Sequence, residues 1–407
     1  MTFLRSLLCS LALVASSMPV LAAEGKIQHC EPGPWGRIEY QTIFLEAPDW
    51  IVEKFPLPNP QPRWSFGNTD RDAVREFLIK ADIAPATVER WLDDPRSAVI
   101  EGSLAIFPSV EDIEGLSSMT RSIVYPELAK LPVNEFYNQP VFVTGKSVEE
   151  WLAGAELPAP IVELISKLCY LDGDALLFSD LATLMSHAES EAQARSWLKA
   201  TTRTRAVLAY LRIGPDDDVA ALSAYWSSGQ RRKDVVPMLQ SIAETPDGDR
   251  VDLTHLLPSQ ARKLIYTYPS PDAGLWGQMP NCHWTSLNFF NYIPQNVYLD
   301  LKLAATGVLS RYKKVPEPEM LGDVLFFLDA NGMAYHSCVY IADKLVFTKN
   351  GDNIVAPWIL TSLDDVKQVY MRRPGAKIVV YRQQDPSETV PFSTNGRASH
   401  KRRPGSS

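Results

Sequence analysis

The stretch "GDVLFFLDANGMAYHSCVYIADKLVFTKNG", residues 322–351, decides the fold of the last third of this 407-residue chain. Its apolar runs are separated by turn residues, and Asn331-Gly332 is a strong signal for a hairpin between the first two runs. The stretch predicts successive antiparallel strands, and "AKIVVYR" at 376–382 predicts a further strand.

A helix is predicted just before this sheet. Pro280 disfavours helical backbone at the residue before it, so the helix in "CHWTSLNFF" is expected to begin near Cys282. Leu287 and Phe290, three positions apart, are expected to anchor it in the core. A second helical stretch follows at 297–309. Residues 266–384 therefore predict an α+β domain, with a cysteine-bearing helix packed on an antiparallel sheet.

The preceding residues 24–265 predict a mostly helical N-terminal domain, whose role the sequence does not reveal. Apolar residues recur there every three to four positions, and Ser147 with Glu150 forms a capping box. Segments expected to be helical are 72–83, 85–94, 148–154, 191–213 and 234–244. Segments expected to be strands are 37–46, 139–145 and 174–180.

The two ends of the chain differ from the rest. Residues 1–23 combine Arg5, a short apolar run and the small residues "VLAA", which is typical of a cleaved secretory signal peptide. The apolar run is short for a membrane anchor, and no later segment is apolar enough to span a bilayer. We expect a periplasmic or secreted protein. The polar tail, residues 385–407, is expected to be disordered.

The composition of the chain argues against a nucleic-acid partner. The chain is 45% hydrophobic and 22% charged, which is ordinary for a globular protein. Its formal net charge is −8, and it lacks the basic stripe of a nucleic-acid-binding protein. We expect no nucleic-acid partner, and the oligomeric state stays open.

Export exposes the cysteines that follow the signal peptide to an oxidising compartment. They are Cys30, Cys169, Cys282 and Cys338. This even number permits two disulfides, one or none, and a Cys282–Cys338 bridge is one open possibility. A zinc site would need His283 and His336 with these two cysteines, but an adjacent Cys-His pair suits one ion poorly. We expect no metal and no cofactor.

Cys282 is also a candidate nucleophile. A helix N-terminus and a nearby imidazolium both stabilise a thiolate. His283 is a poor partner, because neighbouring side chains on a helix diverge by about 100°. His336 shares one strand face with Cys338 and Tyr340, since side chains alternate along a strand. A sheet packed on the Cys282 helix would bring His336 to the sulfur.

These segments resemble the NlpC-type cell-wall cysteine peptidases of the papain-like superfamily. In that family a cysteine opens a helix and a Gly-Asp-apolar-Phe-Phe strand follows. The catalytic histidine then opens a strand that continues Val-Tyr-Ile or Val-Tyr-Leu. The matching positions are Cys282, Gly322-Asp323, Phe326-Phe327, His336 and Val339-Tyr340-Ile341. The resemblance covers residues 266–384 and implies a papain-like fold.

The chain departs from the family near the nucleophile. The family usually has Asp-Cys-Ser-Gly, whereas this chain has Asn-Cys-His-Trp, which places His283 and Trp284 at the oxyanion and substrate region. The family's third catalytic residue orients the imidazole from the next strand. Asn350 is favoured for this role, with Thr348 as the alternative. Tyr268 is the nearest match to the family's upstream tyrosine.

The resemblance implies that Cys282 attacks an amide carbonyl while His336 transfers the proton. With export, it suggests peptidoglycan stem peptides as the substrate. Two alternatives stay open. One is a non-catalytic exported binding or scaffold protein, with Cys282 bridged or inert. The other is an acyltransferase or lipid amidase that uses the same two residues, since one fold serves several functions.

Overall fold

The computed structural model describes residues 26–384, except positions 144, 146, 230 and 271–277. The predicted signal peptide and the predicted disordered tail lie outside the described residues. Helices and several antiparallel sheets make up the described chain, which confirms the α+β class. None of the helices within these residues is long and apolar enough to cross a membrane.

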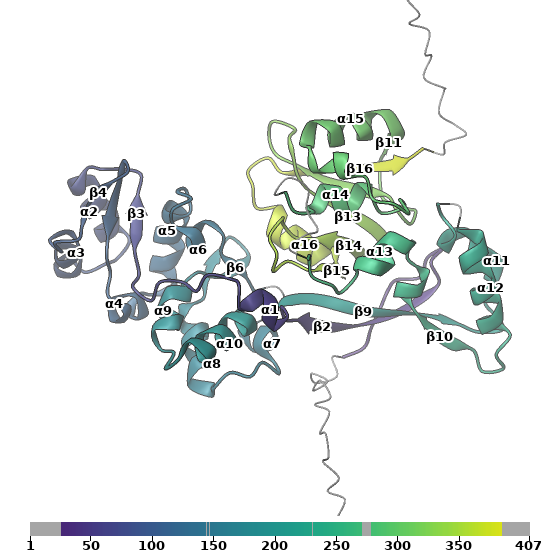
Figure 1. The fold of residues 1–407 in the computed structure, drawn as a ribbon, viewed down its shortest axis with the longest axis horizontal. Helices are drawn as coiled ribbons and strands as arrows, with labels where there is room; N and C mark the ends of the chain where they lie inside the picture. Colours follow the sequence, from purple (N-terminus) through teal and green to yellow (C-terminus); the bar gives the residue numbers. More distant parts are fainter. Residues whose placement is uncertain (1–25, 144, 146, 230, 271–277, 385–407) are drawn as a thin grey trace, which may run out of the picture.

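Residues 47–203 form a helical lobe with its own core, drawn mostly in blue on the left of Figure 1. Its helices are α1 Asp49–Val52, α2 Arg71–Lys80, α3 Pro85–Leu92, α4 Val110–Gly115, α5 Ser118–Leu128, α6 Glu135–Asn138, α7 Val148–Leu152, α8 Ala159–Leu168, α9 Leu181–Ser186 and α10 Glu191–Thr201. Its strands are β3 Trp64–Phe66, β4 Ala98–Ile100, β5 Ser103–Ile106, β6 Val141–Phe142, β7 Tyr170–Asp172 and β8 Ala175–Phe178. The predicted cap of α7 is confirmed, because Ser147 Oγ accepts a hydrogen bond from the Glu150 N–H at 3.2 Å.

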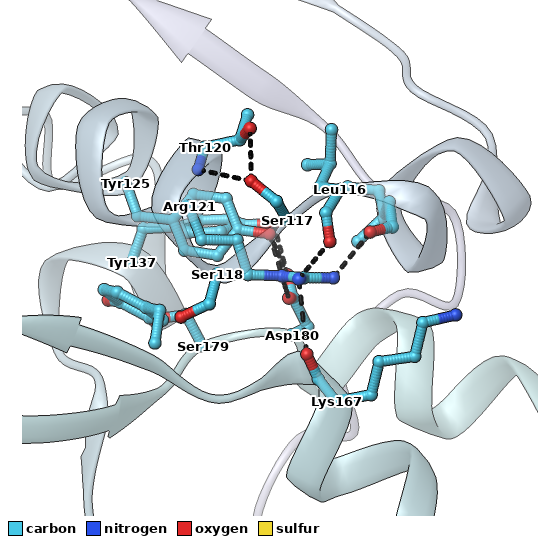
Figure 2. Close-up of polar contacts among 12 residues, drawn as sticks. Leu116, Ser117, Ser118, Thr120, Arg121, Tyr125, Tyr137, Lys167, Ser179 and Asp180 are labelled. Atoms are coloured by element: carbon cyan, nitrogen blue, oxygen red, sulfur yellow. Dashed lines mark hydrogen bonds and ion pairs between the residues drawn. The ribbon is translucent and has the colours of Figure 1, made fainter. Parts of the chain in front are cut away.

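A buried ion pair holds the centre of this lobe together (Figure 2). Arg121 Nε lies 3.2 Å from Asp180 Oδ2, and both side chains are fully buried. The hydroxyls of Tyr125 and Tyr137 donate to the same carboxylate, at 2.8 and 3.2 Å from Oδ1. The Arg121 guanidinium also donates to the backbone carbonyls of Leu116 and Ile113. Each buried charge is therefore hydrogen-bonded, as its desolvation requires.

The lobe is inserted between two paired strands. Strand β2 Arg37–Leu45 runs into it and strand β9 Thr204–Ile213 runs out of it, and the two pair from Arg37↔Arg212 to Leu45↔Thr204. The prediction of helix across 191–213 is therefore right for α10 but wrong for residues 204–213. Val207, Ala209 and Leu211 alternate into the core with the period of a strand.

Residues 26–46 and 204–384 form the body of the molecule. Its first part contains β1 Gln28–His29, β10 Asp249–Asp252, α11 Val219–Trp226, α12 Arg232–Ala243, the 3₁₀ helix η1 Leu253–Leu256 and α13 Ser259–Leu264. The order of its sheet is β1-β2-β9-β10. One hydrophobic core includes Val207 and Trp226 together with Trp284 and Val339. The predicted domain boundary at residue 265 therefore does not divide the core.

The rest of the body carries the candidate site. Its elements are α14 Cys282–Leu287, η2 Asn296–Leu299, α15 Leu301–Arg311, β11 Tyr312–Val315, β12 Val324–Leu328, β13 Ala334–Ala342, β14 Leu345–Lys349, β15 Trp358–Ser362, α16 Leu363–Tyr370 and β16 Lys377–Gln383. The predicted helix at 282 and the strands in 322–351 and 376–382 are confirmed. The sheet order is β11-β16-β12-β13-β14-β15.

The predicted hairpin turn joins β12 to β13. Gly332 has φ +80°, and its N–H donates to the Asp329 carbonyl at 3.0 Å. Asp329 Oδ1 accepts from the backbone N–H groups of Asn331 and Met333, each at 2.9 Å. A glycine is required there because its conformation is left-handed. The turn fixes the register of β13 and therefore the side of the sheet to which each of its residues points.

Candidate active site

Cys282 is the first residue of α14. The preceding residue, Asn281, caps the helix: its Oδ1 accepts a hydrogen bond from the Trp284 N–H at 2.9 Å. An asparagine in this position satisfies a backbone donor that would otherwise lack a partner. The sequence thus predicted the start of this helix correctly, and the cap fixes the direction in which the cysteine leaves the backbone.

The thiol of Cys282 is buried, with 6% of the residue exposed. Burial raises its pKa to about 11. Hydrogen bonds from the backbone N–H groups of Ser337, His283 and Cys282 itself oppose that rise, as does the charge of Lys349. Burial therefore opposes ionisation of the resting thiol. Loss of solvent outweighs the helix N-terminus and the neighbouring donors.

The sheet opens beside this sulfur. Pairing between β13 and β14 runs from Val339↔Phe347 to Ala342↔Leu345 and does not extend to the first residues of β13. Ser337 pairs only with β12, opposite Phe326. Its N–H is directed to the sulfur of Cys282 rather than to a strand partner. The α14 N-terminus therefore lies at the separation of two central strands.

His336 is fully buried, and its two ring nitrogens differ. Nε2 lies 3.3 Å from the Thr348 hydroxyl, while Nδ1 has no hydrogen-bond partner. The ring stacks on Tyr370, with centroids 3.7 Å apart and 5° between the planes. Burial, with His283 nearby, holds the pKa of His336 well below its usual value. The imidazole is therefore neutral, with one nitrogen unpaired.

The two faces of β13 serve different neighbours. His336, Cys338 and Tyr340 do share a face, and the core on that side includes Val366 of α16. Ser337 faces α14, where its hydroxyl lies 2.9 Å from His283 Nδ1 and 3.1 Å from Ser286 Oγ. Helix α14 thus packs mainly on the face of the sheet opposite His336. The sequence predicted instead that the helix would pack on the face that carries His336.

Tyr370 links Cys282 to the His336 face. Burial raises the pKa of the Tyr370 phenol, and charge on Cys282 and Cys338 raises it further. Charge on Cys282 also adds to the burial that raises the pKa of Cys338. A negative charge on Cys282 would therefore interact with Cys338 and Tyr370 on the His336 face of the sheet. Tyr370 thus has an interaction with each of the two residues, whereas His336 Nδ1 makes no hydrogen bond to Cys282.

The residue that contacts the imidazole from β14 is Thr348, the alternative, rather than Asn350. Asn350 lies one step farther away, with its Oδ1 3.5 Å from the Thr348 hydroxyl. The strand brings both residues to the His336 side, as their spacing predicted. Their catalytic roles stay predictions.

Three other predicted site residues have structural partners. His283 bonds Ser337 and stacks on Phe326 with ring centroids 5.9 Å apart. Trp284 Nε1 donates to Asn296 Oδ1 at 3.1 Å, and the ring is buried. The Tyr268 ring packs against the cluster of α1, and its buried hydroxyl has no hydrogen-bond partner. The side chains of His283 and Trp284 therefore stabilise the packing of α14 against its neighbours. The groups that face the Cys282 sulfur are backbone N–H groups.

All four cysteines of the described residues are free thiols. The Cys282–Cys338 bridge and the Cys30–Cys169 bridge left open by the sequence are therefore not formed in this structure. Among the described residues, no three His, Cys, Asp or Glu side chains are grouped so that they could hold a metal ion.

Two hollows adjoin the site. A cavity of about 670 Å³ is lined by Asn281, which precedes Cys282, and by Asp352 of the loop after β14. A cleft of about 1240 Å³ lies between the lobe and the body, and both Asn350 and Tyr370 line it. From the lobe, Phe136 and other aromatic and proline side chains line the same cleft. The cleft thus reaches the ring that stacks on His336.

Sequence reasoning missed two residues of this neighbourhood. Tyr370 ends α16, a helix that was not predicted, and Lys349 was not singled out as a site residue. The sole signal for Lys349 was its position between Thr348 and Asn350, which places it on the opposite face, toward α14. The NlpC resemblance of residues 266–384 stays a prediction. Comparison with protein-family models, curated proteins and solved structures finds no match to this chain.

Proposed function

We propose that this protein is an exported cysteine hydrolase that cleaves an amide bond through Cys282 and His336, with peptidoglycan stem peptides as the substrate. The papain-like fold of residues 266–384 is part of the same proposal. Export and the substrate rest on the signal-peptide pattern and on the NlpC resemblance. The chemistry rests on the surroundings of the two side chains.

The observation that carries the proposal is the unpaired Nδ1 of His336. A buried polar atom without a partner is costly and uncommon, so its presence calls for an explanation. The Thr348 hydroxyl lies within hydrogen-bond distance of His336 Nε2, at 3.3 Å, and His336 Nδ1 has no hydrogen-bond partner. If the Thr348 hydroxyl accepts from Nε2–H, Nδ1 carries the lone pair of a general base.

The reaction begins from a neutral pair. Nδ1 of His336 takes the thiol proton as Cys282 Sγ bonds to the carbonyl carbon of the substrate. The backbone N–H groups at the start of α14 stabilise the negative oxygen that develops. The imidazolium then protonates the leaving amine, and a thioester remains on Cys282. Water, deprotonated by His336, hydrolyses this thioester and restores the thiol.

Burial favours a second candidate, a non-catalytic binding protein with an inert thiol. His336 is 0% exposed and Cys282 is 6% exposed, and neither lines the large cleft. Under this hypothesis the cleft alone binds the ligand. An acyltransferase or lipid amidase would use the same two residues and differs only in its acyl donor and acceptor.

Product analysis separates these functions. Purified peptidoglycan and synthetic stem peptides are incubated with wild type, Cys282→Ala, His336→Ala and the control Cys169→Ala, whose thiol lies in the helical lobe. We expect new free amino groups and shortened peptides by mass spectrometry, lost in the first two variants and kept in the control. The same proteins are incubated in parallel with acyl-lipid substrates, and products in that incubation alone would assign the lipid amidase. Binding without any product, unchanged by Cys282→Ala, would contradict the hydrolase.

A further inference from the structure

The geometry around β14 points to Lys349 as a positioning residue: we propose that its buried ammonium group promotes ionisation of Cys282 and holds the loop beside it. The inference deepens the proposed function, because it rests on Cys282 as the nucleophile. Lysine side chains are ordinarily exposed to solvent, so the full burial of Lys349 is unexpected.

Lys349 is the last residue of β14 and points to the α14 face of the sheet. It pairs with Trp358 of β15, and its Nζ lies 5.8 Å from the centroid of that indole ring. Trp358 Nε1 in turn donates to Thr285 Oγ1 of α14 at 2.9 Å. The residue is 0% exposed. Lys349 therefore lies in the layer between the sheet and the cysteine-bearing helix.

Both hydrogen bonds of the ammonium group go to neutral backbone carbonyls. Nζ lies 2.9 Å from the carbonyl oxygens of Gly351 and of Asn353. These bonds turn the loop after β14 back on the strand, and Gly351 adopts φ +92° within it. Asp352, between the two carbonyls, lines the cavity that Asn281 also lines. Lys349 thereby shapes the wall next to the nucleophile.

A buried lysine is costly, so its charge calls for a reason. Burial lowers the pKa of Lys349 to about 8, while charge on Asp352 and on Cys282 opposes the decrease. Reciprocally, the positive charge of Lys349 partly offsets the burial that raises the pKa of Cys282. An apolar side chain would fill the same volume without the desolvation cost. The charge is useful where a neighbouring thiol must become an anion during the reaction.

Other titratable groups act on the same sulfur or beside it. Cys338 and Tyr370 disfavour a thiolate if they ionise, because they are acids that interact with Cys282. His336 and His283 are both held neutral by burial. Of these neighbours, Lys349 is the one whose charge favours the Cys282 thiolate.

Alkylation of the folded protein by iodoacetamide, followed by peptide mass mapping of Cys282, tests the inference without any substrate. Lys349→Gln keeps donors for the two carbonyls but removes the charge. Lys349→Met removes both, and Lys349→Arg keeps the charge. Exposed Lys377→Gln on β16 is the matched control, and circular dichroism reports folding.

We expect Lys349→Gln and Lys349→Met to slow alkylation of Cys282 about tenfold at pH 7.5, which corresponds to about one unit of pKa. Lys349→Arg and Lys377→Gln stay close to wild type. Unchanged reactivity in folded Lys349→Gln overturns the proposal. A loss confined to Lys349→Met also overturns it, since that loss reports loop support alone.

The wild type gives a second test if the variants do not fold. Because the thiolate fraction far below its pKa rises tenfold per pH unit, an isolated thiol gives a straight logarithmic rise in rate. Loss of the Lys349 proton near pH 8 should flatten that rise between about pH 7 and 9. A straight line through this range overturns the inference. If alkylation of Cys282 depends on Lys349 but the hydrolase assay gives no product, only the proposed function is contradicted and the inference about Lys349 is kept.

Discussion

The phenol ring of Tyr370 lies flat on the imidazole of His336, with ring centroids 3.7 Å apart and planes 5° apart. The two residues come from α16 and β13. The Tyr370 carbonyl also accepts a hydrogen bond from the Tyr335 hydroxyl, so the end of α16 is tied to the same strand. This stacking excludes solvent from His336 and leaves its ring little freedom to rotate.

Removing the Tyr370 ring should hydrate the imidazole. In Tyr370→Ala we expect the pKa of His336 to rise toward its ordinary value, because burial is the main cause of its depression. The lost aromatic packing should lower the free energy of unfolding by about 3 kcal/mol. Histidine proton resonances across a pH titration and urea unfolding measure the two effects. Tyr370→Phe, which keeps the ring, is the control and should change neither by much.

His336 should make stability depend on acid. Its pKa is depressed in the folded state, so above pH 6.5 it is neutral in both states and its contribution to stability is complete. As pH falls below 6.5, the unfolded chain takes up a proton that the folded protein resists. Urea unfolding at pH 7.5 and pH 5 should therefore show a smaller decrease in His336→Gln than in wild type. The exposed His29→Gln variant should behave as wild type. An equal decrease in all three proteins would contradict the role assigned to His336.

Substitutions at Thr348 and at Asn350 should affect kcat to different extents. Thr348→Val removes the hydroxyl next to His336 Nε2 at nearly constant shape, and we expect kcat to fall about tenfold, as loss of one such hydrogen bond implies. Thr348→Ser should retain most activity. Asn350→Ala should have a smaller effect, since Asn350 reaches the imidazole only through Thr348. Steady-state kinetics on the cleaved stem peptide provide the measurement. The reverse order of effects would favour Asn350 as the orienting residue.

Asp180 should be indispensable for the helical lobe. Asp180→Asn leaves the fully buried Arg121 charge without its carboxylate, which should cost about 3–5 kcal/mol. Burial, opposed by Arg121 and the two tyrosine hydroxyls, raises the pKa of Asp180 to about 6. The contribution of Asp180 to stability, measured as the difference between wild type and variant, should therefore fall as pH rises between about 4 and 6, because the unfolded chain releases this proton first. Thermal unfolding of wild type and variant across this range tests both statements. Asp93→Asn, at an exposed position of the same lobe, is the control and should leave the transition unchanged.

The sequence predicted those parts of the site that depend on local rules. A proline and an asparagine mark the start of α14, and the Asn331-Gly332 turn sets the register of β13. His336 and Thr348 were therefore expected on one side of the sheet, where the structure has them. These features depend on residues that are close in the chain.

Features that depend on distant residues were missed. Residues 204–213 form a strand because β2 pairs with them, and no local feature of that segment predicts this pairing. Lys349 is buried only because β15 and α14 enclose it, whereas lysine is ordinarily exposed. Burial also raises the pKa of Cys282, an effect that its position at the start of a helix does not reveal.

The insertion of the helical lobe between β2 and β9 has a consequence for synthesis. Strand β2 leaves the translation machinery long before its partner, with all of residues 46–203 in between. The central sheet cannot close until the lobe has brought its two ends together, because pairing across an unfolded loop of that length carries a high entropic cost. We expect the lobe to fold first and the body to assemble around the strands that it delivers.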